Sequence, residues 1–540
     1  MPSVSPADLS VGAFSASPPW LIDPAQMRWR AGAAALRSAT AGQVPQLLRR
    51  RRLPPGRRVV RVGMVLGRAV GGWYLVERRQ GRREGRPEHS RAGLSRRLRV
   101  AFQTLGPTYI KLGQILSSGE GLFPPELVSE FRLLRDRVPP ESFESVRSVV
   151  EEDLGAPLEE LFTRFDRQPL AAASIAQVHS ATLRSGEDVV VKVQRPAVST
   201  TVRTDLAAMS WIAPYLIGRI PVSALANPPA LVELFAETIV EELDFRLEAD
   251  NMLDVARVLA ATDQRSVVVP RPHPKLVTRR VLVMERLSGF SFDDVEGMHK
   301  AGIDTAAVVR ALMISFLEGA TLFGVFHGDL HGGNLFVRED GTVALLDYGI
   351  TGRLDEPRRL AFLKMLMGGT INDPKMQLAA LRDLGALPLD TDLDAVIRDL
   401  GIDGPVKDPT AMAPEELLAE IREIIKQLLA YGARIPKVLM LYVKDLLFLD
   451  GALATLAPDV DLFAEVTHIA TYFAERYGER IAADVGVDPR QQAVDLDGMR
   501  AQLGVTSEVE HMSHRDLQAR RELIRKRMED HSRSKRRRKR

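Results

Sequence analysis

The chain of 540 residues contains no cysteine. This absence excludes disulfide bonds, thiolate zinc sites and a cysteine nucleophile, and it is compatible with a reducing compartment. Long apolar runs are missing too, since the best candidate, residues 206–218, contains Pro214 and is too short to span a bilayer. We therefore expect no transmembrane helix, and a chain that is cytoplasmic or at most peripheral at a membrane.

A secretory signal is also absent, because residues 1–24 lack the basic and apolar regions of such a signal. The stretch that follows is rich in Arg, Ala and Ser and resembles a mitochondrial presequence in composition, which leaves an organellar origin open. Apolar residues make up 45% and charged residues 26% of the chain, as in soluble globular proteins. The length suits two or three domains.

Charge is strongly segregated along the chain. Residues 1–100 contain 20 Lys+Arg against 5 Asp+Glu, residues 511–540 contain 13 against 4, and the middle contains 40 against 61. Basic ends of this kind predict attraction to an anionic membrane surface, to nucleic acid or to the acidic body of the same protein. The charge pattern does not choose among these partners, and nothing in the sequence indicates the oligomeric state.

Helix and strand patterns predict the domain organisation. Helices are expected at 60–78, 108–118, 125–137 and 228–255, strands at 176–183, 188–193, 267–270 and 276–284, and a hairpin at 334–349 with its turn at Asp340 and Gly341. We divide the chain into a disordered N-terminus at 1–26, an Arg-rich region at 27–100, a helical extension at 101–165, a sheet-bearing lobe at 166–288, a helical lobe at 289–490 and a basic tail at 491–540. The expected fold is α+β: a two-lobed, protein-kinase-like fold with a small antiparallel sheet, a helical C-lobe and an N-terminal helical extension.

The strongest chemical signal is the segment 327–334 (HGDLHGGN), followed by 345–349 (LLDYG). Phosphoryl transfer needs a carboxylate beside the attacking hydroxyl, a magnesium-binding amide beyond it and a second carboxylate on the metal. Asp329 and Asn334 are five residues apart, as in the kinase catalytic loop, and Asp347 stands where the D-F-G aspartate would. We predict Asp329 as the catalytic base, with Asn334 and Asp347 as magnesium ligands.

A lysine on a strand must meet the phosphates in such a fold. Lys192 lies in the otherwise apolar strand 188–193, where an unpaired charge would be costly. The helix expected at 228–255 carries several acids that could pair with it, among them Glu237, Glu241, Glu242, Asp244 and Glu248. The sequence alone does not select the one that meets Lys192, and we favour Glu237 or Glu242. Glu285 ends a strand whose form predicts the hinge between the lobes, where backbone groups would bind adenine.

Three further motifs carry a family resemblance: residues 111–114 (KLGQ), 169–179 (PLAAASIAQVH) and 242–244 (ELD). With them, the chain resembles the UbiB/AarF atypical kinases over about residues 100–460. In that family the K-x-G-Q helix folds over the active site with its Lys near the E-x-D acids, and an alanine-rich loop replaces the glycine-rich nucleotide loop. The resemblance implies that ATP or ADP with Mg²⁺ is bound with the help of Lys111, Gln114, Ala171, Ala172, Ala173, Ser174, Glu242 and Asp244.

Two departures from ordinary kinases shape the expected activity. Alanines restrict a backbone that glycines would leave free, so nucleotide should be held differently and transfer should be slow. After Gly349 there is no A-P-E segment, which disfavours an ordinary protein substrate. The resemblance connects the chain with isoprenoid quinone or other lipid metabolism at membranes. The alternatives are a small-molecule phosphotransferase of the aminoglycoside or choline kinase type, which lacks K-x-G-Q, and a non-catalytic nucleotide-binding scaffold.

Overall fold

The computed structural model divides into two compact units. Unit 1 comprises Met1–Ala261, Val269–Leu287 and Leu346–Ile350, and unit 2 comprises Thr262–Val268, Ser288–Leu345 and Thr351–Arg540. The described residues are 27–49, 56–83, 87–117, 124–134, 139–216, 228–371, 373–401, 427–428, 430–433, 436–492, 494–502, 509–520, 522–523 and 526. The predicted disordered N-terminus and most of the predicted basic tail lie outside them.

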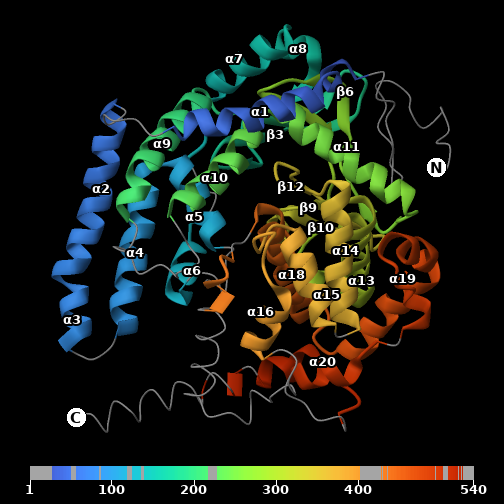
Figure 1. Cartoon of the computed structure of the whole chain (residues 1–540). Coiled ribbons are helices and arrows are strands. Elements are labelled where there is room, and N and C mark those ends of the chain that lie inside the picture. The colour runs from blue at the N-terminus through green and yellow to red at the C-terminus, as the bar shows by residue number, and fades with distance from the viewer. Residues whose placement is uncertain are drawn as a thin grey trace. The chain divides into compact units, whose positions relative to one another are not determined.

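Unit 1 begins with helices. They are η3 (Arg28–Arg30), α1 (Ala33–Leu47), α2 (Gly56–Leu75), α3 (Glu77–Arg83), α4 (Pro87–Leu105), α5 (Pro107–Ser117), α6 (Pro125–Phe131), α7 (Phe143–Leu154) and α8 (Leu158–Leu161). Helices α2 and α4 lie side by side (Figure 1). The helices expected at 60–78 and 108–118 are confirmed as α2 and α5, whereas α6 ends at Phe131, before the predicted end.

A six-stranded antiparallel sheet follows. Its strands are β1 (Phe162–Phe165), β2 (Ala171–Ala172), β3 (Ala176–Leu183), β4 (Asp188–Gln194), β6 (Pro272–Val277) and β7 (Val281–Glu285), in the order β1-β3-β4-β7-β6 with β2 paired to β3. The single strand expected at 276–284 is wrong, because the chain turns at Thr278, whose amide donates to the carbonyl of Val281. The two resulting strands, β6 and β7, pair with each other.

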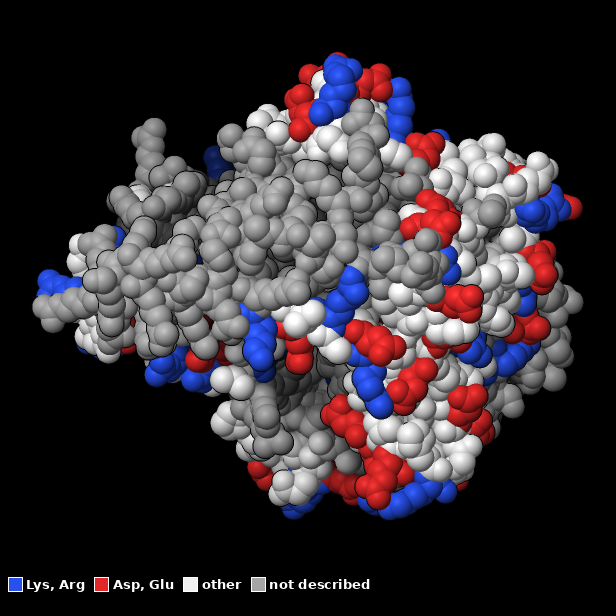
Figure 2. All heavy atoms as spheres, turned by 90° about the horizontal axis from the view of Figure 1, so that it is seen from below, with Lys and Arg blue, Asp and Glu red and all other residues white. Residues whose placement is uncertain are grey.

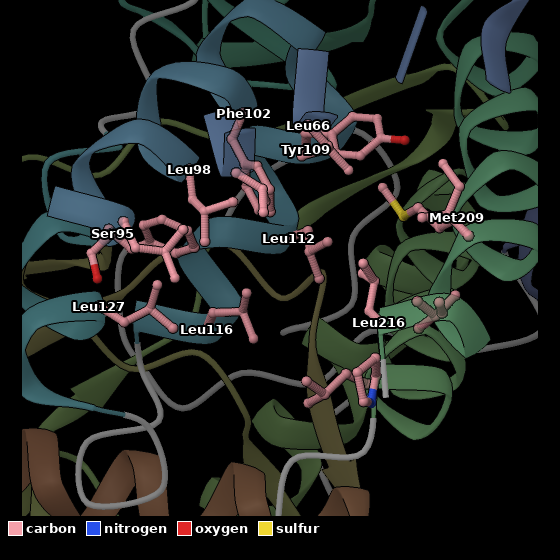
Figure 3. Close-up of a pocket in the computed structure, with 18 of the residues that line it drawn as sticks. Leu66, Ser95, Leu98, Phe102, Tyr109, Leu112, Leu116, Leu127, Met209 and Leu216 are labelled. Atoms are coloured by element: carbon pink, nitrogen blue, oxygen red, sulfur yellow. The ribbon is translucent and has the colours of Figure 1, made fainter. Parts of the chain in front are cut away.

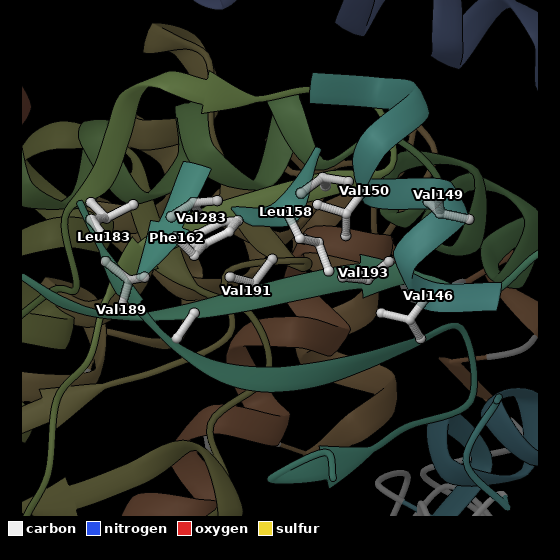
Figure 4. Close-up of a cluster of buried hydrophobic side chains, with 12 residues drawn as sticks. Val146, Val149, Val150, Leu158, Phe162, Leu183, Val189, Val191, Val193 and Val283 are labelled. Atoms are coloured by element: carbon white, nitrogen blue, oxygen red, sulfur yellow. The ribbon is translucent and has the colours of Figure 1, made fainter. Parts of the chain in front are cut away.

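One face of this sheet forms a core against α7. Val146, Val149 and Val150 of α7 pack over Val189 and Val191 of β4 (Figure 4). Side chains alternate along a strand, so this burial commits the odd-numbered residues of β4 to one face and the even-numbered residues to the other.

The second layer of unit 1 contains α9 (Val198–Ile212), η4 (Ala213–Leu216), α10 (Pro228–Glu242) and α11 (Phe245–Ala261). The single helix expected at 228–255 is wrong, because the chain leaves the helical conformation after Glu242 and begins a new helix at Phe245. The carboxylate of Asp244 accepts a hydrogen bond from the amide of Arg246 at this break, an interaction with a nearby backbone group that competes with helix continuation.

Unit 2 is mainly helical. Its strands are β5 (Val267–Val268), β8 (Phe290–Ser291), β9 (Val325–His327), β10 (Leu335–Val337), β11 (Val343–Leu345) and β12 (Thr351–Arg353). Its helices are α12 (Val295–Lys300), α13 (Thr305–Glu318), the π-helical turn η5 (Gly319–Phe323), η6 (Gly332–Asn334), α14 (Glu356–Thr370), α15 (Pro374–Asp383), α16 (Leu393–Leu400), α18 (Lys437–Leu456), α19 (Leu462–Val485), η7 (Pro489–Gln491) and α20 (Leu496–Gln502). The predicted hairpin is confirmed as β10 and β11, with Gly341 at its turn in the left-handed region (φ 79°).

The α+β kinase-like fold class is therefore confirmed: an antiparallel sheet with helical cover, then a largely helical unit. Two stretches, Gly56–Gly81 and Thr305–Phe323, are long and apolar enough to cross a membrane by length and composition. The second is 56% buried, as in a core helix, whereas the first is 17% buried. On the face drawn in Figure 2, acidic and basic side chains are interspersed over the described surface.

Candidate active site

Lys192 and Glu248 form a buried ion pair in unit 1. Lys192 is an even-numbered residue of β4 and points away from the core that holds Val191 and Val193. On that face its Nζ donates to Glu248 of α11 over 2.7 Å. The carboxylate of Asp347 lies 3.2 Å from the same Nζ. Asp347 keeps 47% of its side chain exposed. Of the trio formed by Lys192, Glu248 and Asp347, it is therefore the residue that can contact a ligand.

The segment that carries Asp347 is held in an uncommon conformation. Asp347 has φ 54°, in the left-handed region that few residues other than glycine adopt. The amide of Gly349 donates to its carboxylate over 3.1 Å, and Asn251 of α11 donates to the carbonyl of Tyr348 over 2.8 Å. A Cβ at Gly349 would lie 3.2 Å from Asp347 and 3.4 Å from Glu242. Local strain of this kind is typical of functional sites.

The electrostatics of the trio favour a charged lysine. Burial alone would lower the pKa of Lys192, but the carboxylates of Asp347 and Glu248 outweigh it, so the pKa is raised. Burial raises the pKa of Glu248 to about 7; Lys192 opposes this rise, and the neighbouring Asp347 and Glu242 add to it. The crowded carboxylates repel one another, so a metal cation at the exposed Asp347 would relieve that repulsion.

The expectation that Glu237 or Glu242 pairs with Lys192 is wrong. Both residues belong to α10, whereas Glu248, the partner of Lys192, belongs to α11, which begins after the break. Glu242 instead lies 3.1 Å from the ammonium of Lys111 on α5. The position of Glu248, three residues after the start of the new helix, would have identified it only if the break had been recognised.

Three other predicted site residues of unit 1 contact neighbours outside the Lys192 cluster. Asp244 forms an ion pair of 2.7 Å with Arg246. Gln114 donates to the carbonyl of Leu134 over 3.2 Å. Glu285 ends β7, and its carboxylate accepts a hydrogen bond from the amide of Arg271.

The alanine-rich loop is tied to its surroundings. Ala171 and Ala172 form β2, which pairs with β3, and Ser174 is buried. Arg195, at the end of β4, donates to the carbonyl of Ala173 over 3.0 Å and forms an ion pair of 2.9 Å with Glu141. Arg195 thus restrains the loop in addition to the alanine methyl groups, a role that the sequence did not reveal.

The catalytic-loop motif lies in unit 2, between β9 and β10. The amide of Asp329 donates to Nδ1 of His327 over 3.1 Å, and the side-chain amide of Asn334 donates to the carbonyl of Asp329 over 3.1 Å. Lys444 of α18 contacts the carboxylate of Asp329 and donates to the carbonyl of Gly328. No local sequence pattern indicates Lys444, because it lies 115 residues further along the chain.

Asp445, the next residue of α18, supports the same loop. Its Oδ1 accepts a hydrogen bond from the amide of Leu330 over 3.0 Å. It is fully buried, and burial raises its pKa well above the ordinary value, although Lys444 and the amide of Leu330 oppose the rise. Adjacent residues of one helical turn therefore hold the backbone and the carboxylate of the loop around Asp329.

Within the described residues, no group of three or more His, Asp or Glu side chains is arranged to hold a metal by itself. Each unit nevertheless contains an oxygen donor from the kinase-like motifs, the carboxylate of Asp347 in unit 1 and the amide oxygen of Asn334 in unit 2. Oxygen donors of this kind suit Mg²⁺, which is commonly bound by one or two protein groups together with substrate phosphates. The chemistry of each donor by itself therefore fits a metal that arrives with a nucleotide.

Comparison with known proteins identifies the family. A family model described as the ABC1 atypical kinase-like domain matches residues 133–380. An uncharacterised protein of Mycobacterium tuberculosis is 36% identical over 396 residues, covering 69% of this chain and 76% of that protein. A probable protein kinase UbiB of Vibrio parahaemolyticus is 32% identical over 387 residues, covering 70% of each chain. The chain belongs to the UbiB family of ABC1 atypical kinase-like proteins.

Two further proteins are similar to this chain. The chloroplastic Arabidopsis thaliana protein ACTIVITY OF BC1 COMPLEX KINASE 1 is 32% identical to this UbiB-family chain, covering 73% of it and 57% of the plant protein. A Mycobacterium tuberculosis protein solved in complex with erythromycin matches 64% of this chain and 91% of its own, with a TM-score of 0.38 and 21% identity. The family motifs of the UbiB proteins, K-x-G-Q and E-x-D, meet here in the contact between Lys111 and Glu242.

Proposed function

We propose that this UbiB-family chain binds Mg-ATP and cleaves its γ-phosphate, as an ATPase or a slow phosphotransferase. The observation that carries the proposal is the charge arrangement around Lys192, a buried cation held by Glu248 beside the half-exposed Asp347. A phosphate-binding lysine needs this arrangement, because an acid must hold it in place and a second carboxylate must grip the metal.

In this proposal each residue has a defined task. Lys192 would hold the phosphates. Asp347 and Asn334 are the proposed ligands of Mg²⁺, which would supply positive charge to the phosphate oxygens. Asp329 orients the attacking hydroxyl or water and accepts its proton. We further propose that the activity serves isoprenoid quinone or other lipid metabolism at a membrane surface, as the family resemblance implies.

Asp347→Asn tests the nucleotide site. An amide cannot replace the carboxylate on the metal, so we expect Mg-ATP to bind at least about tenfold more weakly, a loss of roughly 1.4 kcal/mol or more. Asp340→Asn, in the exposed hairpin turn of unit 2, is the matched control and should bind as the parent does. Unchanged Mg-ATP affinity in Asp347→Asn would contradict the assignment.

ATP turnover separates the competing functions. The proposed enzyme releases phosphate from ATP with Mg²⁺, and Asp347→Asn does not. A scaffold would bind Mg-ATP without turnover. A small-molecule phosphotransferase would consume ATP only when an aminoglycoside or choline-like acceptor is added, and that acceptor dependence would favour the alternative.

A further inference from the structure

A cavity of about 170 Å³ lies among the helices of unit 1 (Figure 3). Its wall is formed by α2, α4, α5, α6, α9, η4 and α10. Apolar cavities of about 150 Å³ in other proteins stay free of water and bind small hydrocarbons. The cavity is therefore large enough for a segment of a hydrocarbon chain or a single ring.

The wall presents hydrocarbon to the cavity. Helix α2 contributes Val62, Leu66 and Val70, which are spaced by four residues and so share one face. Helix α5 contributes Leu112 and Leu116 in the same way. A ligand of this cavity must accordingly be apolar over most of its surface, because a polar group buried here without a partner would be strongly unfavourable.

Two polar side chains at the edge of the cavity, Ser95 and Arg91, already have hydrogen-bond or ion-pair partners. The hydroxyl of Ser95 donates to the carbonyl of Arg91 on the same helix over 2.9 Å. The guanidinium of Arg91 pairs with Glu126 at 2.9 Å. Neither group adds an unpaired donor or acceptor to the wall.

Tyr109 is different. This lining residue of α5 is 2% exposed, and its hydroxyl has no hydrogen-bond partner within the described residues. Figure 3 shows the hydroxyl directed toward the helix that carries Met209. A buried hydroxyl without a partner costs about 1–3 kcal/mol, which an oxygen atom of a ligand would recover. The ligand that fits is thus a hydrocarbon chain with an oxygen.

The outer face of α2 indicates where such a ligand comes from. Val60, Met64 and Leu75 of this helix are more than half exposed, and Arg61 and Arg68 lie exposed among them. A helix with exposed apolar residues interleaved with arginines suits the surface of an anionic bilayer. One helix therefore presents an apolar face to the outside and another face to the cavity.

We propose that this cavity binds the hydrocarbon chain of a membrane lipid, with an oxygen of the lipid at the hydroxyl of Tyr109. The inference deepens the lipid-linked part of the proposed function and stands on the cavity wall rather than on the nucleotide site. Helix α5 connects the two regions: Tyr109, Leu112 and Leu116 face the cavity, and Lys111 extends from another face to Glu242.

Binding of two soluble probes to the full chain, without nucleotide, tests the site. Farnesol stands for an isoprenyl chain and lauric acid for an acyl chain, each used below its micelle concentration. Tryptophan fluorescence is a suitable readout, because Trp211 of α9 lies between the wall residues Met209 and Ile212. We expect saturable binding of at least one probe, and the tighter one identifies the chain type.

Cavity-filling variants supply the decisive comparison. Ala213→Leu and Val232→Phe come from different elements of the wall and should each weaken probe binding at least about tenfold, because the added atoms occupy the cavity. Ala207→Leu, on α9 outside the wall, is the matched control and should bind as the parent does. Tyr109→Phe should weaken farnesol severalfold. Melting temperatures identify any variant that fails to fold. If one of the two cavity-filling variants does not fold, probe binding to the other one tests the site.

Two results would overturn the proposal. One is a parent protein that binds neither probe. The other is a pair of folded filling variants that bind the probes as tightly as the parent, with raised melting temperatures, since this would mark the cavity as a packing defect. Loss of ATP binding in Asp347→Asn is measured separately, so failure of the proposed enzyme function and failure of this site are distinguishable.

Discussion

Lys192 of β4 donates to Glu248 of α11 over 2.7 Å, and both side chains are buried. The same helix holds the segment around Asp347 through Asn251. A single helix thus positions both Lys192, the proposed phosphate-binding lysine, and Asp347, the proposed metal ligand. Any change that shifts α11 should therefore affect nucleotide binding together with the stability of the fold, because most of this helix is buried.

Glu248→Ala should weaken both nucleotide binding and folding. The substitution removes the closest partner of a buried ammonium, which costs about 3–5 kcal/mol when no other partner remains. Asp347 stays 3.2 Å from the same ammonium, so we expect the free energy of unfolding in urea to fall by less than this amount and the affinity for Mg-ATP to fall with it. Glu237→Ala, on α10, is the control. If it reduces ATP affinity as much as Glu248→Ala does, the pairing seen here is not the one that serves the nucleotide.

The stability of the protein should depend on pH through Glu248. Its pKa is about 7 in the folded chain, against an ordinary 4.5. Between these values the folded chain retains a proton that the unfolded chain has lost, so stability decreases as pH rises. Relative to Glu248→Gln, the parent should lose up to roughly 3 kcal/mol of unfolding free energy across this window. The exposed pair of Glu296 and Lys300 supplies the control Glu296→Gln, and a parent with the same pH dependence as Glu248→Gln would contradict the prediction.

Lys444→Met should reduce turnover and leave nucleotide affinity nearly unchanged. Lys444 contacts the carboxylate of Asp329, so its loss removes the cation that positions the proposed base. We expect kcat to fall at least about tenfold with KM for ATP within about twofold. Lys444→Arg should recover part of the rate.

The matched control for this prediction is Lys375→Met, which breaks an exposed ion pair with Asp394 in the same unit. Exposed pairs contribute little to stability, so this variant should behave as the parent does. Equal turnover rates in Lys444→Met and Lys375→Met would show that the contact between Lys444 and Asp329 does not contribute to turnover.

Ala172→Gly should change the preference between ATP and ADP. Glycine at this position frees a backbone that alanine restricts, and the loop would then approach the phosphates differently. We expect a severalfold shift in the ratio of the two affinities, measured by competition with a fluorescent nucleotide. Arg195 holds the neighbouring carbonyl of Ala173, so Arg195→Lys in the Ala172→Gly background should enlarge the shift. A ratio that stays at the parent value in both variants would exclude a role for loop stiffness.

The local sequence determined the fold class and the motif residues. Short motifs carry their own spacing, and Asp329 with Asn334, or Asp347 with Gly349, lie close together in the chain wherever the segment folds. Strand alternation likewise sends Lys192 away from the core once Val191 and Val193 are buried. These inferences needed no knowledge of distant contacts.

Only the tertiary structure decided which residues complete each cluster. The partner of Lys192 depends on a helix break after Glu242, where a local side-chain hydrogen bond outweighs the helical pattern of the surrounding residues. Lys444 reaches Asp329 across 115 residues of chain, and the wall around Tyr109 is assembled from separate helices. Packing between segments far apart in the chain sets these contacts, and a single sequence does not encode them in any local pattern.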